Sequence, residues 1–139
     1  LRPATIQHIE YQNHSTKMAE AVLIINTLYV KSKVMQSQDL QQFNKNQIFN
    51  LVAPGLEEIK AETFKQMPNL QFVYAPMVEK VGDKAFLMCS SLSVFIGGKI
   101  QELENETFNY CYNLSSLDLS KIEKFGKNSF SNSSIKSIR

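Results

Sequence analysis

The sequence lacks the features that mark several common classes of protein. It has no block of lysine and arginine, and its 139 residues carry a net charge of only +2. Nothing therefore indicates a nucleic acid or an anionic membrane surface as partner. The longest apolar run, Ala21–Ile25, is far shorter than the ~20 residues of a membrane-spanning helix, so we expect no membrane insertion. No signal peptide is recognisable, although the first residue is Leu1 rather than methionine, and we expect a processed or trimmed start.

Residues that bind metals or perform catalysis are also scarce. The two histidines, His8 and His14, have Glu10 near them but no third convergent ligand, so a metal site is not expected. Gly97 and Gly98 belong to no phosphate-binding motif and fall where a strand ends in a tight turn. No catalytic serine–histidine–aspartate or cysteine–histidine arrangement can be assembled within the repeats described next. We predict no catalytic residue and no cofactor, and we interpret the acidic residues as a solvated surface.

The sequence does contain a repeat with a period of 22 residues. Four phenylalanines keep this spacing: Phe64, Phe86, Phe108 and Phe130. Five further columns of mostly apolar residues keep it too, and they begin at Leu56, Ile59, Met67, Leu70 and Val73. One residue is missing after Phe130, which is the only slip. Such columns are expected when coils with one apolar edge stack on one another and share a continuous core.

Each repeat divides into recognisable pieces. The segments 70–75, 92–97 and 114–119 have the form L-x-x-Φ-x-(small or Φ), which predicts short strands of a parallel sheet along one side. A second extended piece follows and bends near Gly82 and Gly126. A short helical turn surrounds each phenylalanine, and a turn then leads to the next strand.

These motifs resemble those of the BspA-like class of leucine-rich repeat. Units of that class read approximately L-x-x-I-x-L-P-x-x-V-x-x-I-G-x-x-A-F-x-x-C-x-x, and "VEKVGDKAFLMCSSL" at 78–92 follows this form almost throughout. Lys60 and Glu104 stand where the first and third repeats would have glycine. The resemblance covers about residues 48–139. It implies an α/β repeat fold, a leucine-rich-repeat solenoid of about four coils with parallel strands and short helical turns.

The first 47 residues fit the period poorly, and we predict that 1–47 form an α/β amino-terminal cap on the array at 48–139. A strand is expected at 4–12 and a turn at 13–16. Apolar residues at Met18, Val22, Ile25 and Leu28 predict a helix over 17–29. A second, shorter helix is expected at 37–45. The chain stops in the middle of a predicted strand, which indicates either an array that continues beyond residue 139 or a frayed last coil.

The two cysteines, Cys89 and Cys111, are themselves 22 residues apart. Neighbouring coils about 4.8 Å apart would bring them close enough to consider a disulfide. Side chains stacked in one column point the same way, however, and Met67 and Ser133 occupy the same column. We therefore predict two buried, unpaired cysteines.

The outward positions of the predicted strands provide the candidate binding residues, because they form two columns of largely apolar side chains. These residues are Phe72, Tyr74, Val94, Ile96, Ser116 and Asp118. In a leucine-rich-repeat solenoid they would lie on the concave face, where exposed aromatic and apolar residues typically mark a contact site. Two alternatives stay open: the cap or an absent segment covers the patch, or the strand faces are inverted by one residue.

The sequence thus favours a non-catalytic protein-recognition module over an enzyme. The family resemblance implies a cell-surface or secreted location and adhesion to host cells or matrix, as is usually proposed for surface proteins of mucosal bacteria and anaerobic protists. Two alternatives remain. One is an intracellular scaffold with a cytoplasmic protein partner, which the two unpaired cysteines favour. The other is the recognition arm of a larger enzyme.

Overall fold

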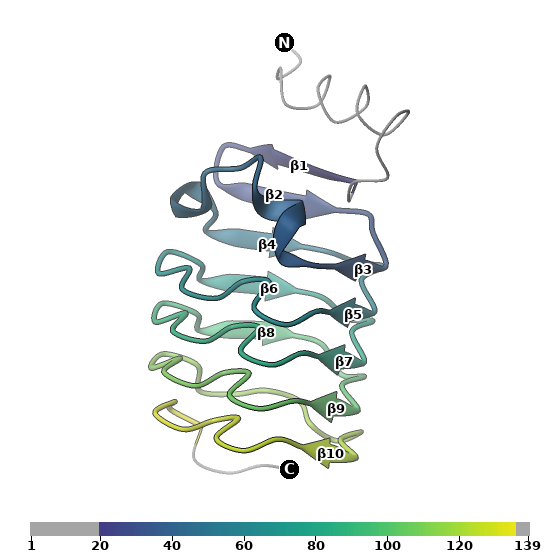
Figure 1. The fold of residues 1–139 in the computed structure, drawn as a ribbon, viewed down its shortest axis with the longest axis vertical. Coiled ribbons are helices and arrows are strands. Elements are labelled where there is room, and N and C mark those ends of the chain that lie inside the picture. Colours follow the sequence, from purple (N-terminus) through teal and green to yellow (C-terminus); the bar gives the residue numbers. More distant parts are fainter. Residues whose placement is uncertain (1–19, 136–139) are drawn as a thin grey trace.

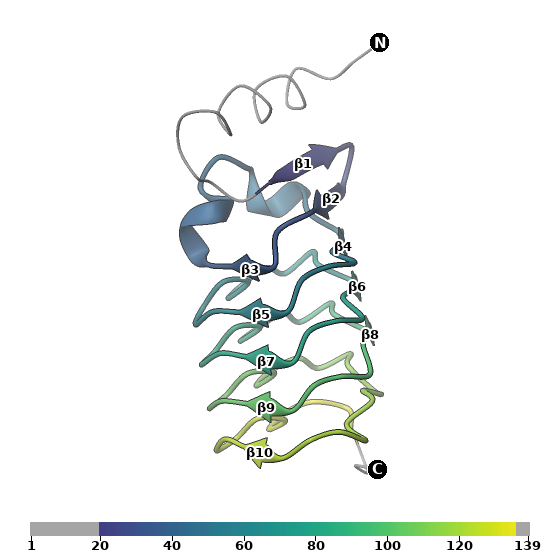
Figure 2. The same cartoon turned by 90° about the vertical axis from the view of Figure 1, so that its right-hand side faces the viewer.

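The computed structural model describes residues 20–135, which form a stack of coils with a β-sheet on each of two sides (Figure 1). The first sheet has the strand order β1-β2-β4-β6-β8, and the second has the order β3-β5-β7-β9-β10. The chain alternates between the two sheets as it passes from coil to coil (Figure 2). The predicted leucine-rich-repeat solenoid is therefore confirmed, with parallel strands and little helix.

All strands are short, because each crosses only one side of a coil. The first sheet contains β1 (Ala21–Ile24), β2 (Thr27–Val30), β4 (Asn50–Val52), β6 (Phe72–Tyr74) and β8 (Val94–Ile96). The second contains β3 (Val34–Met35), β5 (Glu58–Ile59), β7 (Lys80–Val81), β9 (Glu102–Leu103) and β10 (Lys124–Phe125). Two 3-10 helices, η1 (Ser37–Leu40) and η2 (Lys45–Gln47), connect β3 to β4.

The 22-residue period of the sequence is the register of the sheets. In the first sheet β6 and β8 are parallel, and Phe72 lies opposite Val94. In the second sheet β7 and β9 are parallel, and Lys80 lies opposite Glu102. Because parallel strands of successive coils present the same repeat position side by side, every column of the sequence becomes a ladder of neighbouring side chains.

The phenylalanine column forms the centre of the core. Phe64 and Phe86 stack with ring centroids 5.1 Å apart, Phe86 and Phe108 with centroids 5.2 Å apart, and Phe108 and Phe130 with centroids 5.8 Å apart. Phe95, from β8, places its ring edge-on to both Phe86 and Phe108 at 5.7 Å. These contacts continue across four coils, so they hold the coils together as one hydrophobic cluster.

The turn around each phenylalanine contains two residues in the left-handed region of φ and ψ. One precedes the phenylalanine by two positions, and these residues are Glu62, Lys84, Glu106 and Asn128, with φ between 55° and 60°. The other follows it by two positions, and these are Gln66, Met88, Tyr110 and Asn132, with φ between 56° and 62°. A left-handed residue reverses the local curvature of the chain, so the pair replaces the predicted helical turn with a sharper one.

The helix predicted over 17–29 is wrong for the part of the chain that the structure describes. Ala21–Ile24 and Thr27–Val30 instead form an antiparallel hairpin, with Leu23 opposite Leu28. The spacing of the apolar residues suits a strand as well as a helix. In the strand β2, Leu28 and Val30 are buried on one side. Since β2 also pairs in parallel with β4, the hairpin extends the first sheet and places Leu28 and Val30 in the shared core.

The second predicted helix, over 37–45, is also incorrect as a single element. Ser37–Leu40 forms a short 3-10 helix, and a turn separates it from a second one at Lys45–Gln47. The predicted strand at 4–12 and the turn at 13–16 lie outside the described residues. The boundary between cap and array after residue 47 stays a prediction, although the parallel pairing of β3 with β5 begins before it.

Candidate functional site

The outward side of the first sheet carries the residues predicted from the sequence. In β6 and β8 the central residues Val73 and Phe95 point into the core. Their neighbours point outward: Tyr74 is 37% exposed, Val94 41% and Ile96 43%, while Phe72 is half-buried. The assignment of strand faces is thus confirmed, and the alternative of inverted faces is excluded.

The register adds a residue that the sequence prediction missed. Tyr29 of β2 lies opposite Val52, which in turn lies opposite Tyr74. Tyr29 is 44% exposed. It was not predicted to belong to this column, because residues 17–29 were predicted to form a helix. We name the resulting surface the apolar outer face; its residues are Tyr29, Val52, Phe72, Tyr74, Val94 and Ile96.

The last two predicted residues lie at the end of this face, where the sheet becomes irregular. Ser116 is joined to Val94 by an isolated bridge rather than a full strand. Asp118 follows beyond it and is exposed, as Ser116 is. The six predicted residues are therefore brought together on one side of the solenoid, four on regular strands and two beyond the sheet edge.

The outward side of the second sheet is chemically different, because its column alternates in charge. Glu58, Lys80, Glu102 and Lys124 are successive neighbours along it. The Glu102 carboxylate lies 3.8 Å from the Lys80 amine and 4.0 Å from the Lys124 amine. Exposed pairs of this kind contribute little to stability. They do give the charged side chains of Lys80, Glu102 and Lys124 oppositely charged partners within the protein.

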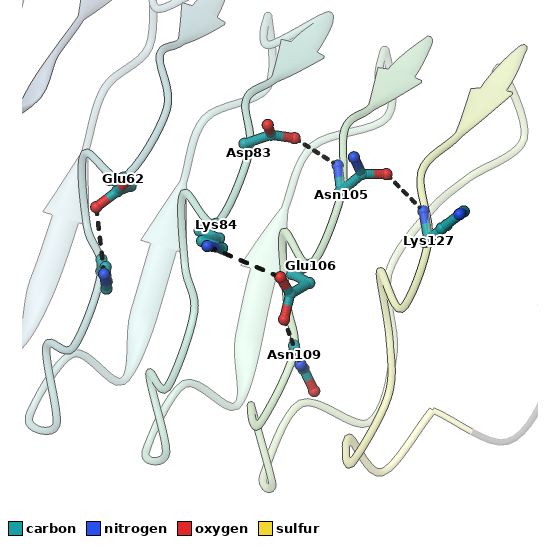
Figure 3. Close-up of polar contacts among 8 residues, drawn as sticks. Glu62, Asp83, Lys84, Asn105, Glu106, Asn109 and Lys127 are labelled. Carbon is teal, nitrogen blue, oxygen red and sulfur yellow. Dashed lines mark hydrogen bonds and ion pairs between the residues drawn. The ribbon is translucent and has the colours of Figure 1, made fainter.

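A polar ladder continues this pattern into the turns, as Figure 3 shows. The backbone N–H of Asn105 donates to the Asp83 carboxylate at 2.8 Å, and the backbone N–H of Lys127 donates to the Asn105 side-chain oxygen at 2.8 Å. The Lys84 amine lies 4.0 Å from the Glu106 carboxylate. These acidic residues contact lysines and backbone amides of neighbouring coils, which is the environment of a solvated structural surface.

Both cysteine thiols are free and buried, as predicted. The Cys89 thiol donates to the backbone carbonyl of Phe64 at 2.9 Å, and the Cys111 thiol to that of Phe86 at 3.1 Å. Burial raises the pKa of Cys89 to about 12 and raises the pKa of Cys111 as well. Thiols that remain protonated and enclosed are poor nucleophiles.

This environment predicts that neither cysteine reacts in the folded protein. At pH 8 we expect iodoacetamide to leave Cys89 and Cys111 unmodified for hours, because the thiolate is the reactive form and is almost absent. In 6 M guanidinium chloride, added as the unfolding control, both should alkylate within minutes. Mass spectrometry of the two samples checks this, and rapid labelling without denaturant would contradict the buried geometry.

Within residues 20–135 no three histidine, cysteine, aspartate or glutamate side chains gather as they would around a metal ion. His8 and His14 lie outside the described residues. None of the helices in the same part of the chain is long and apolar enough to cross a membrane.

Comparison with known families agrees with the geometry of the coils. The family profile described as "BspA type Leucine rich repeat region (6 copies)" matches residues 36–139. The chain belongs to the BspA-type leucine-rich repeat family. This family is consistent with a protein-interaction module, and its repeat form is that of a non-catalytic recognition fold. A search of curated proteins found no match.

Solved leucine-rich repeat proteins share the fold at low sequence identity. A protein from Eubacterium ventriosum is 16% identical with a TM-score of 0.69, over 89% of this chain and 38% of its own. One from Bacteroides ovatus is 19% identical with a TM-score of 0.62, over 77% and 28%. The Treponema pallidum protein TpLRR is 16% identical with a TM-score of 0.57, over 89% and 69%. The chain thus spans well under half the length of two of these proteins, and the likeness shows the fold alone.

Proposed function

We propose that this chain is a protein-recognition module whose partner binds the apolar outer face of the first sheet. The observation that carries the proposal is the contrast between the two sheets. Beyond the exposed Val34 of β3, lysine and glutamate line the outward side of the second sheet, whereas tyrosine, phenylalanine, valine and isoleucine line that of the first. Contiguous exposed apolar residues that include aromatics are typical of protein contact sites.

The setting that we favour is adhesion at a cell surface. BspA-type repeats are found in surface proteins of mucosal bacteria, where binding to host cells or matrix is the usual proposal. The two free, buried cysteines instead favour an intracellular scaffold, because unpaired thiols are more typical of reducing compartments. The recognition arm of a larger enzyme is the third arrangement that the sequence analysis left open.

Replacing Phe72 and Tyr74 together with serine should weaken binding at least about tenfold, since central aromatic residues of an interface often contribute 2 kcal/mol or more. The protein should stay folded, because both side chains point away from the core. Binding of purified protein to immobilised host matrix proteins and to source-cell extract, measured by biolayer interferometry, provides the comparison.

The matched control changes two outward residues of the other sheet, Lys80 and Glu102, to serine. We expect this variant to bind as the unaltered protein does, because its apolar outer face is intact. If the folded Phe72→Ser/Tyr74→Ser variant binds as well as the control variant, the apolar outer face is not the contact surface.

Antibody staining of intact and permeabilised source cells separates the two settings. Staining of intact cells is the result expected for an adhesive surface protein. Signal only after permeabilisation would contradict the adhesion setting and would direct the search for a partner to the cytosol, while leaving the binding surface itself in place.

A further inference from the structure

A hollow of about 680 Å³ opens at the edge of the first sheet, next to the apolar outer face. Gly97 and Gly98 line one side of it, and Leu117 and Asp118 line the other. Ile96, the last apolar residue of the column that contains Tyr29, Val52 and Tyr74, also lines it. The hollow therefore continues the surface to which the proposed function assigns the partner.

The hollow exists because the hydrogen-bond ladder between coils is interrupted here. The N–H of Ala53 donates to the carbonyl of Tyr74 at 2.8 Å, and that of Ala75 donates to the carbonyl of Ile96 at 2.9 Å. The corresponding bond, from Gly97 to Asp118, is not formed among the described residues. Among the described residues Gly97 consequently has an N–H without a partner in its neighbouring coil. An added Cβ on Gly97 would meet the Ala75 carbonyl oxygen of the preceding coil at 2.7 Å, so it is Gly98 whose missing side chain leaves space beside Asp118.

One exposed carboxylate lies at this point. A backbone N–H, that of Ser120, donates to one Asp118 oxygen at 3.0 Å. The other oxygen lies against Gly98, where an added Cβ would be 3.0 Å away from it. The Ser120 backbone and hydroxyl, with a smaller contribution from Lys121, lower the pKa of Asp118, so it is ionised at neutral pH. None of the ion pairs found within residues 20–135 includes Asp118.

The carboxylate is also isolated among its outward neighbours. The outward residues of β2, β4, β6 and β8 and of the segment after them are Thr27, Tyr29, Asn50, Val52, Phe72, Tyr74, Val94, Ile96, Ser116 and Asp118. Asp118 is the only carboxylate or amine in this set. A partner that covers the apolar residues therefore meets the Asp118 carboxylate at one end, where Lys121 is the nearby cation whose charge acts on it.

We propose that the hollow between Gly97 and Asp118 binds an arginine or lysine side chain of a partner segment whose apolar residues lie on the apolar outer face. The cationic group pairs with the Asp118 carboxylate, and a backbone carbonyl of the segment accepts from the Gly97 N–H. This inference rests on the proposed function, since it specifies the chemistry of the same partner. The apolar residues supply contact area, and the carboxylate fixes the direction and register of the bound segment.

Two peptides test the charge directly: acetyl-Val-Ser-Val-Arg-amide and the same peptide with citrulline in place of arginine. Citrulline keeps the shape of arginine but is neutral. In an NMR titration we expect the arginine peptide to shift the amide resonances of Gly97, Gly98 and Asp118 saturably. It should bind about three- to fivefold more tightly than the citrulline peptide, the ratio expected of an exposed ion pair. The ratio should fall as sodium chloride is raised.

Asp118→Asn is the matched variant, because the asparagine oxygen can still accept from the Ser120 N–H and keep the turn. It should bind the two peptides equally. The proposal is overturned if unaltered protein binds both peptides equally, or if neither shifts the Gly97 and Gly98 amides saturably. If Phe72→Ser/Tyr74→Ser weakens binding to the matrix proteins or extract while Asp118→Asn does not, the proposed function stands and the cationic site fails.

Discussion

Replacing Phe86 with alanine should lower the free energy of unfolding by about 3–5 kcal/mol, the range typical of phenylalanine removed from a packed core. The ring is fully buried between those of Phe64 and Phe108, with centroids 5.1 and 5.2 Å away, and the Phe95 ring makes a third, edge-on contact. Alanine would leave a cavity in the middle of the stack. Because each coil contacts only its neighbours, that cavity weakens the link between the coils on either side.

Urea unfolding followed by circular dichroism measures this loss. Tyr112→Ala is the matched control, since Tyr112 is an aromatic residue that is 55% exposed and lies outside the phenylalanine stack. The control should change the free energy of unfolding by no more than about 0.5 kcal/mol. A loss under about 1 kcal/mol for Phe86→Ala would mean that the stack does not hold the coils together.

The phenylalanine stack was predictable because residues that stack on one another recur at a fixed spacing in the sequence. A residue that contacts its own equivalent in the next coil must keep its position in every repeat, so Phe64, Phe86 and Phe108 report the fold by their spacing. The same logic identified which strand residues point outward. For the candidate site, the orientations of Phe72 and Ile96 followed from alternation along a strand.

The amino-terminal hairpin was not predictable in this way, because it belongs to no column of the repeat. A short apolar run such as Val22–Ile25 is compatible with either period, and only the tertiary partner decides between helix and strand. That partner is β4, some twenty residues further along the chain. Tyr29 was lost from the candidate site for the same reason.

The left-handed turns and the hollow escaped prediction for local reasons. In a sequence, glycine or asparagine usually indicates a left-handed backbone conformation, but Lys84, Met88 and Tyr110 are neither of these residues. Backbone hydrogen bonds to the next coil hold these residues in the left-handed conformation, such as the bond from the Met88 N–H to the Asn109 carbonyl. Likewise, no pattern indicates that the ladder is interrupted at Gly97, because the interruption depends on the path of the following coil.

Replacing Gly82 with alanine should destabilise the protein by about 1–3 kcal/mol, although the change adds only one methyl group. Gly82 has no positive φ, so its identity is not a matter of backbone conformation. An added Cβ would lie 2.6 Å from the backbone nitrogen of Ala61 and 2.8 Å from the carbonyl carbon of Lys60. Both atoms belong to the backbone of the preceding coil, so no flexible side chain can move aside.

The coils cannot separate easily at this point. Val81 pairs with Ile59 immediately before Gly82, and the Gly82 N–H donates to the Ile59 carbonyl at 2.8 Å. Relief of the clash must therefore lengthen hydrogen bonds of the second sheet or tilt one coil against the next. At Gly82 the two coils approach closely enough to exclude a Cβ, although Lys60 and Glu104 hold the equivalent position in other coils.

Gly55→Ala provides the matched control, because the nearest atom to its added Cβ is the Lys31 carbonyl oxygen at 4.0 Å. This change should be neutral or should stabilise the protein by about 0.4–1 kcal/mol, since alanine reduces the conformational freedom of the unfolded chain. Thermal and urea unfolding of the two variants measure the difference. Equal stability of the two would show that the second sheet accommodates the extra methyl group, and close approach of the coils would then not be what requires glycine at position 82.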